Sequence, residues 1–118
     1  NSGITKSGAG TLVLGGTNTT SGAIHVNQGV LRLNNAAASG AGSPFNLLNN
    51  FVHAGAALEL TGGFSFTADD RFYFSGTGIS NGGALRSVSG ANTWQGLIET
   101  GLGDTRINND SSGLFTIN

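Results

Sequence analysis

The residues of this chain that could do chemistry are few and scattered. Charged residues make up 9% of the 118, far below the roughly 25% that is usual in globular domains. Asp69 and Asp70 are the only adjacent carboxylates. Paired carboxylates can cleave a glycosidic bond when both face one cleft, but neighbours on a strand point to opposite faces. We therefore interpret this pair as a polar turn before Arg71.

The remaining acidic residues form no cluster. They fall one per segment, at Glu59, Glu99, Asp104 and Asp110. The sequence also lacks a nucleophile elbow, a phosphate-binding loop and a dinucleotide fingerprint. We expect no catalytic residue and no enzymatic activity.

Candidate metal ligands are equally sparse. His25 and His53 lack partners at metal-ligand spacing, and cysteine is absent. Residues 101–104 (GLGD) are similar to part of a calcium-binding nonapeptide, which needs a second, stacked copy. The matching place at residues 27–30 holds no Asp. We expect no metal and no cofactor, and we place both histidines at outward strand or turn positions.

Charge and hydropathy argue against two classes of partner. The net charge is −1 and no basic run occurs, so we expect no nucleic-acid binding. No apolar run approaches the roughly 20 residues of a membrane-spanning helix, so we expect no membrane insertion. Because no signal peptide is present, we interpret the chain as a mature segment of a longer precursor.

The apolar residues follow the period of two that is typical of β-strands. Leu31 and Leu33, for example, flank Arg32, so one face of this run is apolar. Gly accounts for 21 residues and punctuates these runs, which predicts short strands joined by tight turns. The predicted strands are Thr11–Leu14, Ile24–Val26, 30–33, 57–60, 64–66, 71–74, 84–88, 97–100, 105–108 and 114–117. Residues 36–42 are interpreted as a loop, and the boundaries within 45–52 stay open.

This register predicts which side chains build the core and which residues form the turns. The expected core is Leu12, Leu14, Ile24, Val26, Leu31, Leu33, Leu58, Leu60, Phe64, Phe66, Phe72, Phe74, Leu85, Ile98, Ile107, Phe115 and Ile117. The expected turn or ladder residues are Gly16, Asn18, Gly22, Gly29, Asn34, Asn35, Gly90, Asn92, Gly96, Gly103, Asn108 and Asn109. The asparagines have two open interpretations: amides that hydrogen-bond from coil to coil, or simple turn formers.

Part of the sequence recurs. Residues 16–35 align with residues 90–109 at an offset of 74 (90 − 16), and Leu33 meets Ile107. The identical positions are Gly16, Asn18, Thr19, Gly22, Ile24, Gly29, Arg32, Asn34 and Asn35 in the first copy. We therefore divide the single segment 1–118 into related units near 3–35 and 79–109.

The run GAGTLVLGGTNTTSGAIHVNQGVLRL resembles the autotransporter-associated β-strand repeat, or passenger-associated transport repeat, of bacterial passenger domains. The later run GGALRSVSGANTWQGLIET is similar to a second form of this repeat. The resemblance implies a right-handed parallel β-helix that is secreted and displayed at the bacterial cell surface. Its motif consists of structural positions and implies no catalytic residue.

We accordingly predict an all-β fold, a right-handed parallel β-helix (β-solenoid) of about five coils. Ten or eleven strands at two or three per coil give that number. A strand spacing of about 4.8 Å then makes the stack about 24 Å long.

The expected function is structural: a stalk or fibre module at the cell surface or outside the cell. Its partners would be neighbouring coils of the parent protein or copies stacked head-to-tail, because we find no cap at either end. Possible gatekeepers near the ends are Lys6, Asp104, Arg106 and Asp110.

The alternative is an adhesin module that binds a glycan or a protein partner. Its surface would use outward Arg32, Tyr73, Arg86, Arg106 and Trp94, and a clustered aromatic stripe would favour it. A polysaccharide-degrading enzyme ranks last and would need several acids in one groove.

Overall fold

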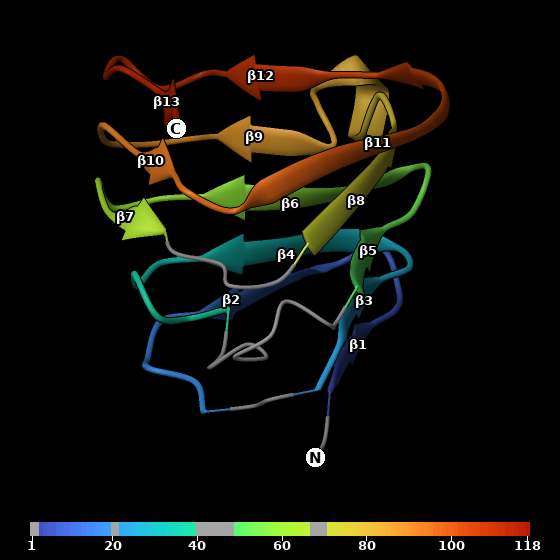
Figure 1. The fold of residues 1–118 in the computed structure, drawn as a ribbon, viewed down its shortest axis with the longest axis horizontal. Coiled ribbons are helices and arrows are strands. Elements are labelled where there is room, and N and C mark those ends of the chain that lie inside the picture. The colour runs from blue at the N-terminus through green and yellow to red at the C-terminus, as the bar shows by residue number, and fades with distance from the viewer. Residues whose placement is uncertain (1–2, 20–21, 40–48, 67–70) are drawn as a thin grey trace.

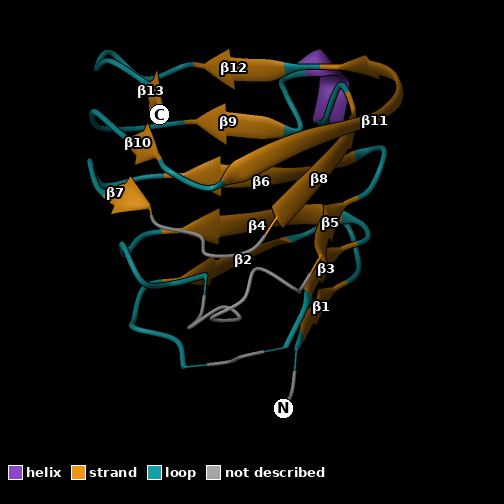
Figure 2. Ribbon diagram, viewed as in Figure 1, coloured by secondary structure: helices purple, strands orange, loops and turns teal. Residues whose placement is uncertain are grey.

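The computed structural model describes residues 3–19, 22–39, 49–66 and 71–118. The fold is an all-β parallel solenoid (Figures 1 and 2). The strands are β1 (Ile4–Lys6), β2 (Thr11–Leu14), β3 (Ile24–Val26), β4 (Gly29–Leu33), β5 (Asn49–Val52), β6 (Ala56–Leu60), β7 (Ser65–Phe66), β8 (Arg71–Gly76), β9 (Leu85–Ser87), β10 (Thr93–Trp94), β11 (Leu97–Thr105), β12 (Ile107–Asn109) and β13 (Thr116–Ile117). A short 3-10 helix, Ile79–Asn81, is drawn in purple in Figure 2. Within the described ranges no helix is long or apolar enough to span a membrane.

Three parallel sheets form the faces of the solenoid. Sheet A has the order β1-β3-β5-β8-β11, sheet B β12-β9-β6-β4-β2, and sheet C β13-β10-β7. Successive coils climb from the N-terminal end at the bottom of Figure 1 to the C-terminal end at the top. The principal extents are 33 × 28 × 26 Å, so the segment is about as wide as it is long.

The number of complete coils is smaller than predicted. Coils with a strand in all three sheets are β5-β6-β7, β8-β9-β10 and β11-β12-β13. In the described residues, the two coils before them contribute strands to sheets A and B alone. About three complete turns therefore replace the predicted five. The all-β solenoid is confirmed, and its right-handed winding stays a prediction.

Strand prediction failed mainly where strands are short or rich in Asn. It missed β1 and β10 and left β5 without boundaries. These strands have few apolar residues of their own, and the parallel partners in adjacent coils hold them in place.

The core consists of inward columns in which each side chain stacks on the equivalent one in the next coil. Leu31, Leu58 and Leu85 form one such column in sheet B, and all are 0% exposed. The other predicted core residues that are buried are Ile24, Val26, Leu33, Leu60, Phe66, Phe72 and Phe74. Leu14, Ile98 and Phe115 are partly buried and pack against this cluster. Burial of this apolar surface is the main stabilising term.

Four predicted core residues are exposed instead. Leu12, Ile107 and Ile117 are 39%, 36% and 49% exposed because they lie in the first or last coil, where a neighbour covers one side only. Phe64, at 36%, precedes β7 and touches Phe66 edge-on. Conversely, Val52, Ala38, Ala56 and Ala84 are buried core residues that the prediction omitted.

Trp94 was predicted to point outward, and this is wrong. The side chain is 0% exposed and lies in β10, in register with Phe66 of β7. Its ring meets Phe72 edge-on at 5.1 Å between centroids and Phe74 at 6.3 Å. Sheet C therefore closes the third side of the core with an indole.

The register corrects the alignment of the two repeat copies. In sheet A, Val26 shares a column with Thr100, which matches the offset of 74. In sheet B, Leu31 shares a column with Ile107, an offset of 76 (107 − 31). The register of β11 shifts between Thr100 and Thr105, so the two sheets have different offsets.

Lys6 modifies the expected open end at β1. It pairs with Val26 in an inward column, is 8% exposed, and its Nζ donates to the carbonyl oxygens of Ser7, Gly8 and Gln28 at 2.9, 2.7 and 3.3 Å. An inward charge at an edge strand disfavours pairing with a further apolar strand. Lys6 was one of the gatekeepers suggested by the sequence, and the stacking of a further coil at either end stays a prediction.

The columns predict a matched difference between two leucines. Leu33→Ala should lower the free energy of unfolding by about 2–5 kcal/mol. The Leu33 side chain is 0% exposed, so its removal leaves a cavity in the core. Leu114→Ala should cost about 0.5 kcal/mol or less, because that side chain is 76% exposed. Urea denaturation measures both, and equal losses would contradict the register.

Candidate functional site

An aromatic column runs along the outer face of sheet A. We define it as His25, Phe51 and Tyr73, which occupy matching positions of β3, β5 and β8, together with His53 beside it. Adjacent rings are stacked: His25 on Phe51 at 5.2 Å and 21°, and Phe51 on Tyr73 at 5.2 Å and 14°. The parallel register places one ring above the next, as it does the leucines inside.

The stacking limits what this column can bind. Each ring face that meets another ring is already covered, so the column differs from a flat platform on which a sugar could lie. It ties three coils together on the outside of the solenoid. Sequence reasoning singled out Tyr73 but missed Phe51, although the alternation of Phe51, Val52 and His53 carries the period-two signal.

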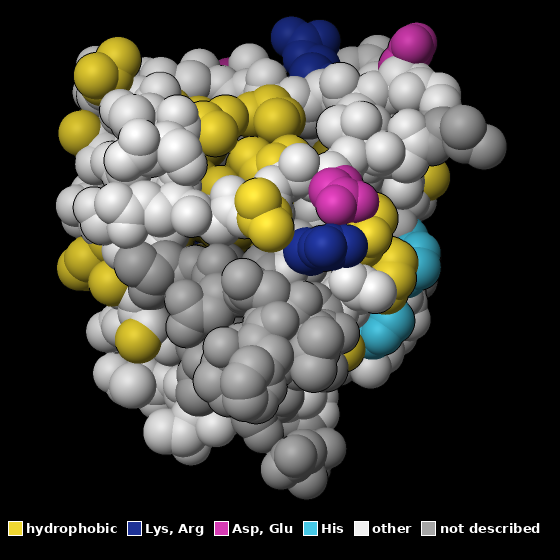
Figure 3. Space-filling model, viewed as in Figure 1, with side chains coloured by type: hydrophobic (Ala, Val, Ile, Leu, Met, Phe, Trp, Pro, Cys, Tyr) yellow, Lys and Arg dark blue, Asp and Glu magenta, His cyan; other side chains and the backbone are white. Residues whose placement is uncertain are grey.

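The fold brings the two histidines together, although they are far apart in the sequence. His53 follows β5 directly, and its ring lies 5.9 Å from that of His25 with an interplanar angle of 15°. Figure 3 shows the two histidines side by side at one edge of the view, next to hydrophobic side chains. Both occupy the outward strand or turn positions that the sequence predicted for them.

A charged column runs along the outer face of sheet B. It consists of Arg32, Glu59 and Arg86 at matching positions of β4, β6 and β9, with Asp110 beyond. Arg32 Nη2 lies 2.7 Å from Glu59 Oε1, and Arg86 Nη1 lies 3.1 Å from Glu59 Oε2. Arg86 Nε also pairs with Asp110. The charges therefore alternate in sign from coil to coil.

Glu59 is the central member of this charged column. Its side chain is 5% exposed, whereas those of Arg32 and Arg86 are 36% and 35% exposed. Each carboxylate oxygen accepts from a different arginine, so the buried charge is paired on both sides. The hydrogen bond to Asp110, with Glu59 as a further negative neighbour, raises the pKa of Arg86 above its usual value.

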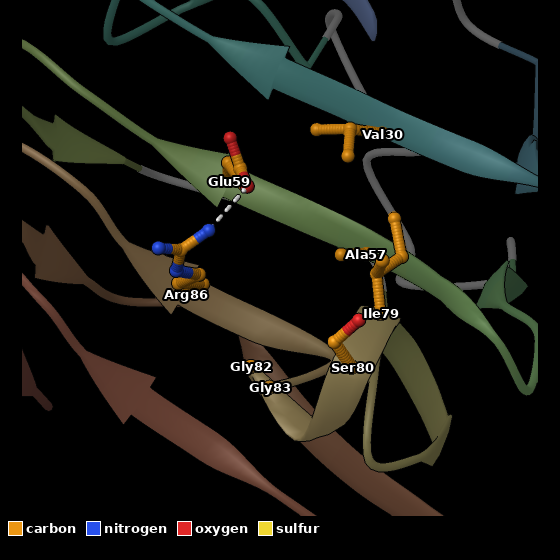
Figure 4. A pocket seen from close by; sticks show the side chains of 8 residues that line it. All are labelled: Val30, Ala57, Glu59, Ile79, Ser80, Gly82, Gly83 and Arg86. Atoms are coloured by element: carbon orange, nitrogen blue, oxygen red, sulfur yellow. Dashed lines mark hydrogen bonds and ion pairs between the residues drawn. The ribbon is translucent and has the colours of Figure 1, made fainter. Parts of the chain in front are cut away.

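A pocket of about 360 Å³ adjoins this charged column (Figure 4). Val30 and Ala57 line it from the sheet, Ile79 and Ser80 from the 3-10 helix, and the Glu59–Arg86 pair lies to one side. Ser80 has a φ of 51°, which is uncommon for a residue with a side chain. Because the two charged groups already pair with each other, the pocket offers a mainly apolar wall to a ligand.

The five residues of the predicted adhesin surface do not share a surface. Arg32 and Arg86 lie on sheet B, Tyr73 lies on sheet A, and Trp94 is inside. Arg106 is exposed between β11 and β12.

The acids predicted to be scattered are only partly so. Glu59 and Asp110 meet through Arg86, while Glu99 lies 3.8 Å from Arg71 in an exposed pair. Asp69 and Asp70 lie outside the described residues. Among the residues that are described, no group of three or more His, Cys, Asp or Glu could hold a metal ion.

Both interpretations of the asparagines apply, at different positions. Asn92 is buried; its Oδ1 accepts from the Gly63 N–H at 2.9 Å, and its Nδ2 donates to the Leu60 carbonyl at 3.3 Å, one coil away. Asn35 and Asn109 instead form turns, because each Oδ1 accepts from the backbone N–H two residues on. Asn50 was missed; it is 3% exposed and accepts from the Ile24 N–H at 2.7 Å.

Residues 4–33 match the family model described as passenger-associated-transport-repeat. This segment is similar to that repeat, and the match covers less than half of the chain. The matched repeat begins with β1 and ends with β4, so it comprises the first two coils. The comparisons with curated proteins and with solved structures found no match. The repeat implies a secreted or surface-exposed protein, and with the solenoid it fits an autotransporter passenger domain.

The structure explains why the matched repeat has glycine at position 29. Gly29 has a φ of 75°, and a Cβ at this position would collide with the carbonyl oxygens of Gly8 and Gly10. Those carbonyls belong to the coil below, and the Gly10 oxygen accepts from the Val30 N–H at 3.1 Å. The close approach of two coils at the start of β4 therefore requires glycine.

The charged column generates a matched pair of substitutions. Glu59→Gln should lower the free energy of unfolding by about 1–3 kcal/mol, because two arginines lose a buried charged partner. Glu99→Gln should cost about 0.5 kcal/mol or less, because its pair with Arg71 is 3.8 Å apart and more than 40% exposed on both sides. Chemical denaturation distinguishes the two. If Glu59→Gln costs no more stability than Glu99→Gln, the charged column does not stabilise the fold.

Proposed function

We propose that this chain is a structural segment of the β-helical stalk of an autotransporter passenger, outside the bacterial cell. The observation that carries the proposal is that the matched repeat, residues 4–33, coincides with the first two coils of a continuous stack. Each coil touches its neighbours, so adding coils extends the protein without changing the core. The work of the segment is to extend the passenger and to resist unfolding.

The side chains on the outer faces support a mechanical role. Glu59 joins β4 and β9 through two ion pairs, and the aromatic column joins β3, β5 and β8. Asn92 adds hydrogen bonds from coil to coil inside the turn region. These groups contact each other, and we propose that the chain performs no catalysis and carries no cofactor.

The partner that we propose is another coil, from the parent protein or from a second copy. At inward register positions the last coil leaves Ile107 and Ile117 exposed and the first coil leaves Leu12 exposed, and Leu114 is exposed beside Ile117. The β1 end and the β11–β13 end are different surfaces, so their contact is head-to-tail and grows an open fibre. We propose that the fibre grows most readily at the β11–β13 end, because Lys6 places a charge at the other.

Association should therefore rise with concentration. We expect the apparent mass from light scattering to increase through the micromolar range, and Leu114→Glu with Ile117→Glu to abolish the increase. Ile79→Glu is the matched control, since Ile79 is 42% exposed but lines the pocket beside Val30 and Ala57 on sheet B. A chain that stays monomeric at high micromolar concentration would overturn the assembly proposal.

An adhesin role is the second candidate, because the aromatic column is the clustered aromatic stripe that the sequence analysis named as its sign. The ring faces of this column nevertheless cover one another. We therefore expect no glycan binding by the purified chain and no cleavage of polysaccharides. Retention on a glycan array measures the first, and release of reducing ends measures the second. Binding that is lost in Tyr73→Ala and kept in Ile79→Glu would establish the adhesin role instead.

A further inference from the structure

The histidine pair belongs to the aromatic column, and the structural role uses the ring faces but not the ring nitrogens of these two side chains. His25 and His53 are the two histidines of the chain, and their ring centroids lie 5.9 Å apart at an angle of 15°. Phe51 stacks against both, at 5.2 Å from His25 and 5.9 Å from His53. Three rings thus form a compact triangle on the outer face of sheet A.

The backbone fixes this arrangement. His25 is paired with Phe51, so His53, two residues further on, is its diagonal neighbour on the same face. The His53 N–H donates to the Val26 carbonyl at 3.0 Å, which holds the end of β5 against β3. The Cα atoms of both histidines are therefore held by the same ladder that stacks the core.

We propose that His25 and His53 form a two-imidazole site for a divalent transition metal, with Zn²⁺, Ni²⁺ and Cu²⁺ as its class of ligand. A metal–nitrogen bond of about 2.0–2.1 Å puts the ion about 3 Å from a ring centroid, so two imidazoles on one ion have centroids about 4.5–6.5 Å apart. At 5.9 Å between their centroids, the stacked rings are close enough for one ion to reach a nitrogen of each after the rings turn. Because the rings are stacked, a nitrogen of each must turn toward the ion; His53 is exposed, and its χ2 torsion is soft.

The composition of the site selects among metals. Imidazole nitrogen suits Zn²⁺, Ni²⁺ and Cu²⁺, whereas Ca²⁺ and Mg²⁺ take oxygen ligands. Among the described residues, no third His, Cys, Asp or Glu joins the pair, so water completes the coordination. With two protein ligands the metal ion exchanges readily. The site should bind Cu²⁺ more tightly than Zn²⁺ or Ni²⁺. Phe51 positions the two rings and touches no ion.

The presence of two histidines gives a direct experiment. The chain, without a histidine tag, is titrated with ZnCl₂ while the imidazole C–H proton resonances are followed by NMR. We expect both sets of resonances to shift together and to saturate at one ion per chain. His25→Gln and His53→Gln each leave one histidine, and each should weaken binding at least tenfold. MgCl₂ should shift neither set.

A second measurement separates metal binding from folding. Zinc should raise the midpoint of chemical denaturation of the unmodified chain, because the ion binds the folded state. His53→Gln should lose the zinc-dependent rise, measured against the metal-free midpoint of the same variant. Glu99→Gln, on the same sheet, should keep the rise. The proposal would be wrong if either histidine variant bound zinc as tightly as the unmodified chain, or if millimolar zinc left the histidine resonances unshifted. Neither result would contradict the structural role.

Discussion

The rest of the structure depends on the in-register stacking of parallel strands from one coil to the next. A residue must face the same way as its partners above and below, because the side-chain period of a strand is two. Leu31, Leu58 and Leu85 therefore share one inward column, and a slip of one residue would turn them all to solvent. The same register that buries the leucines also builds every outer column.

The two outer faces use this constraint in different ways. On sheet B it stacks unlike charges, so that Glu59 is paired on both sides although it is almost buried. On sheet A it stacks ring on ring, from His25 through Phe51 to Tyr73. On both faces the polar or aromatic groups of neighbouring coils bind each other, as ion pairs on sheet B and as stacked rings on sheet A. That self-contained surface supports a stalk, and the proposed metal site would use the ring nitrogens of the histidine pair in the aromatic column.

The coil stack also has a direction. At the β1 end Lys6 turns a charge inward and satisfies it with three carbonyl oxygens. At the other end the last coil exposes apolar side chains and unpaired strand edges. The proposed preference for growth at the β11–β13 end rests on this difference.

The sequence by itself determined the fold class, the repeat and most of the inward columns, because period-two alternation and turn glycines are local signals. It could not decide how deeply the residues of the first and last coils are buried, since this depends on whether another coil covers them. Nor could it decide the position of Trp94, since this depends on the pairing of β10 with β7 in sheet C. It predicted outward positions for His25 and His53 but gave no sign that they are neighbours, because 28 residues (53 − 25) separate them in the chain. Only the stacking of β3 on β5 brings the two rings together, and only the stacking of β4, β6 and β9 encloses Glu59 between two arginines.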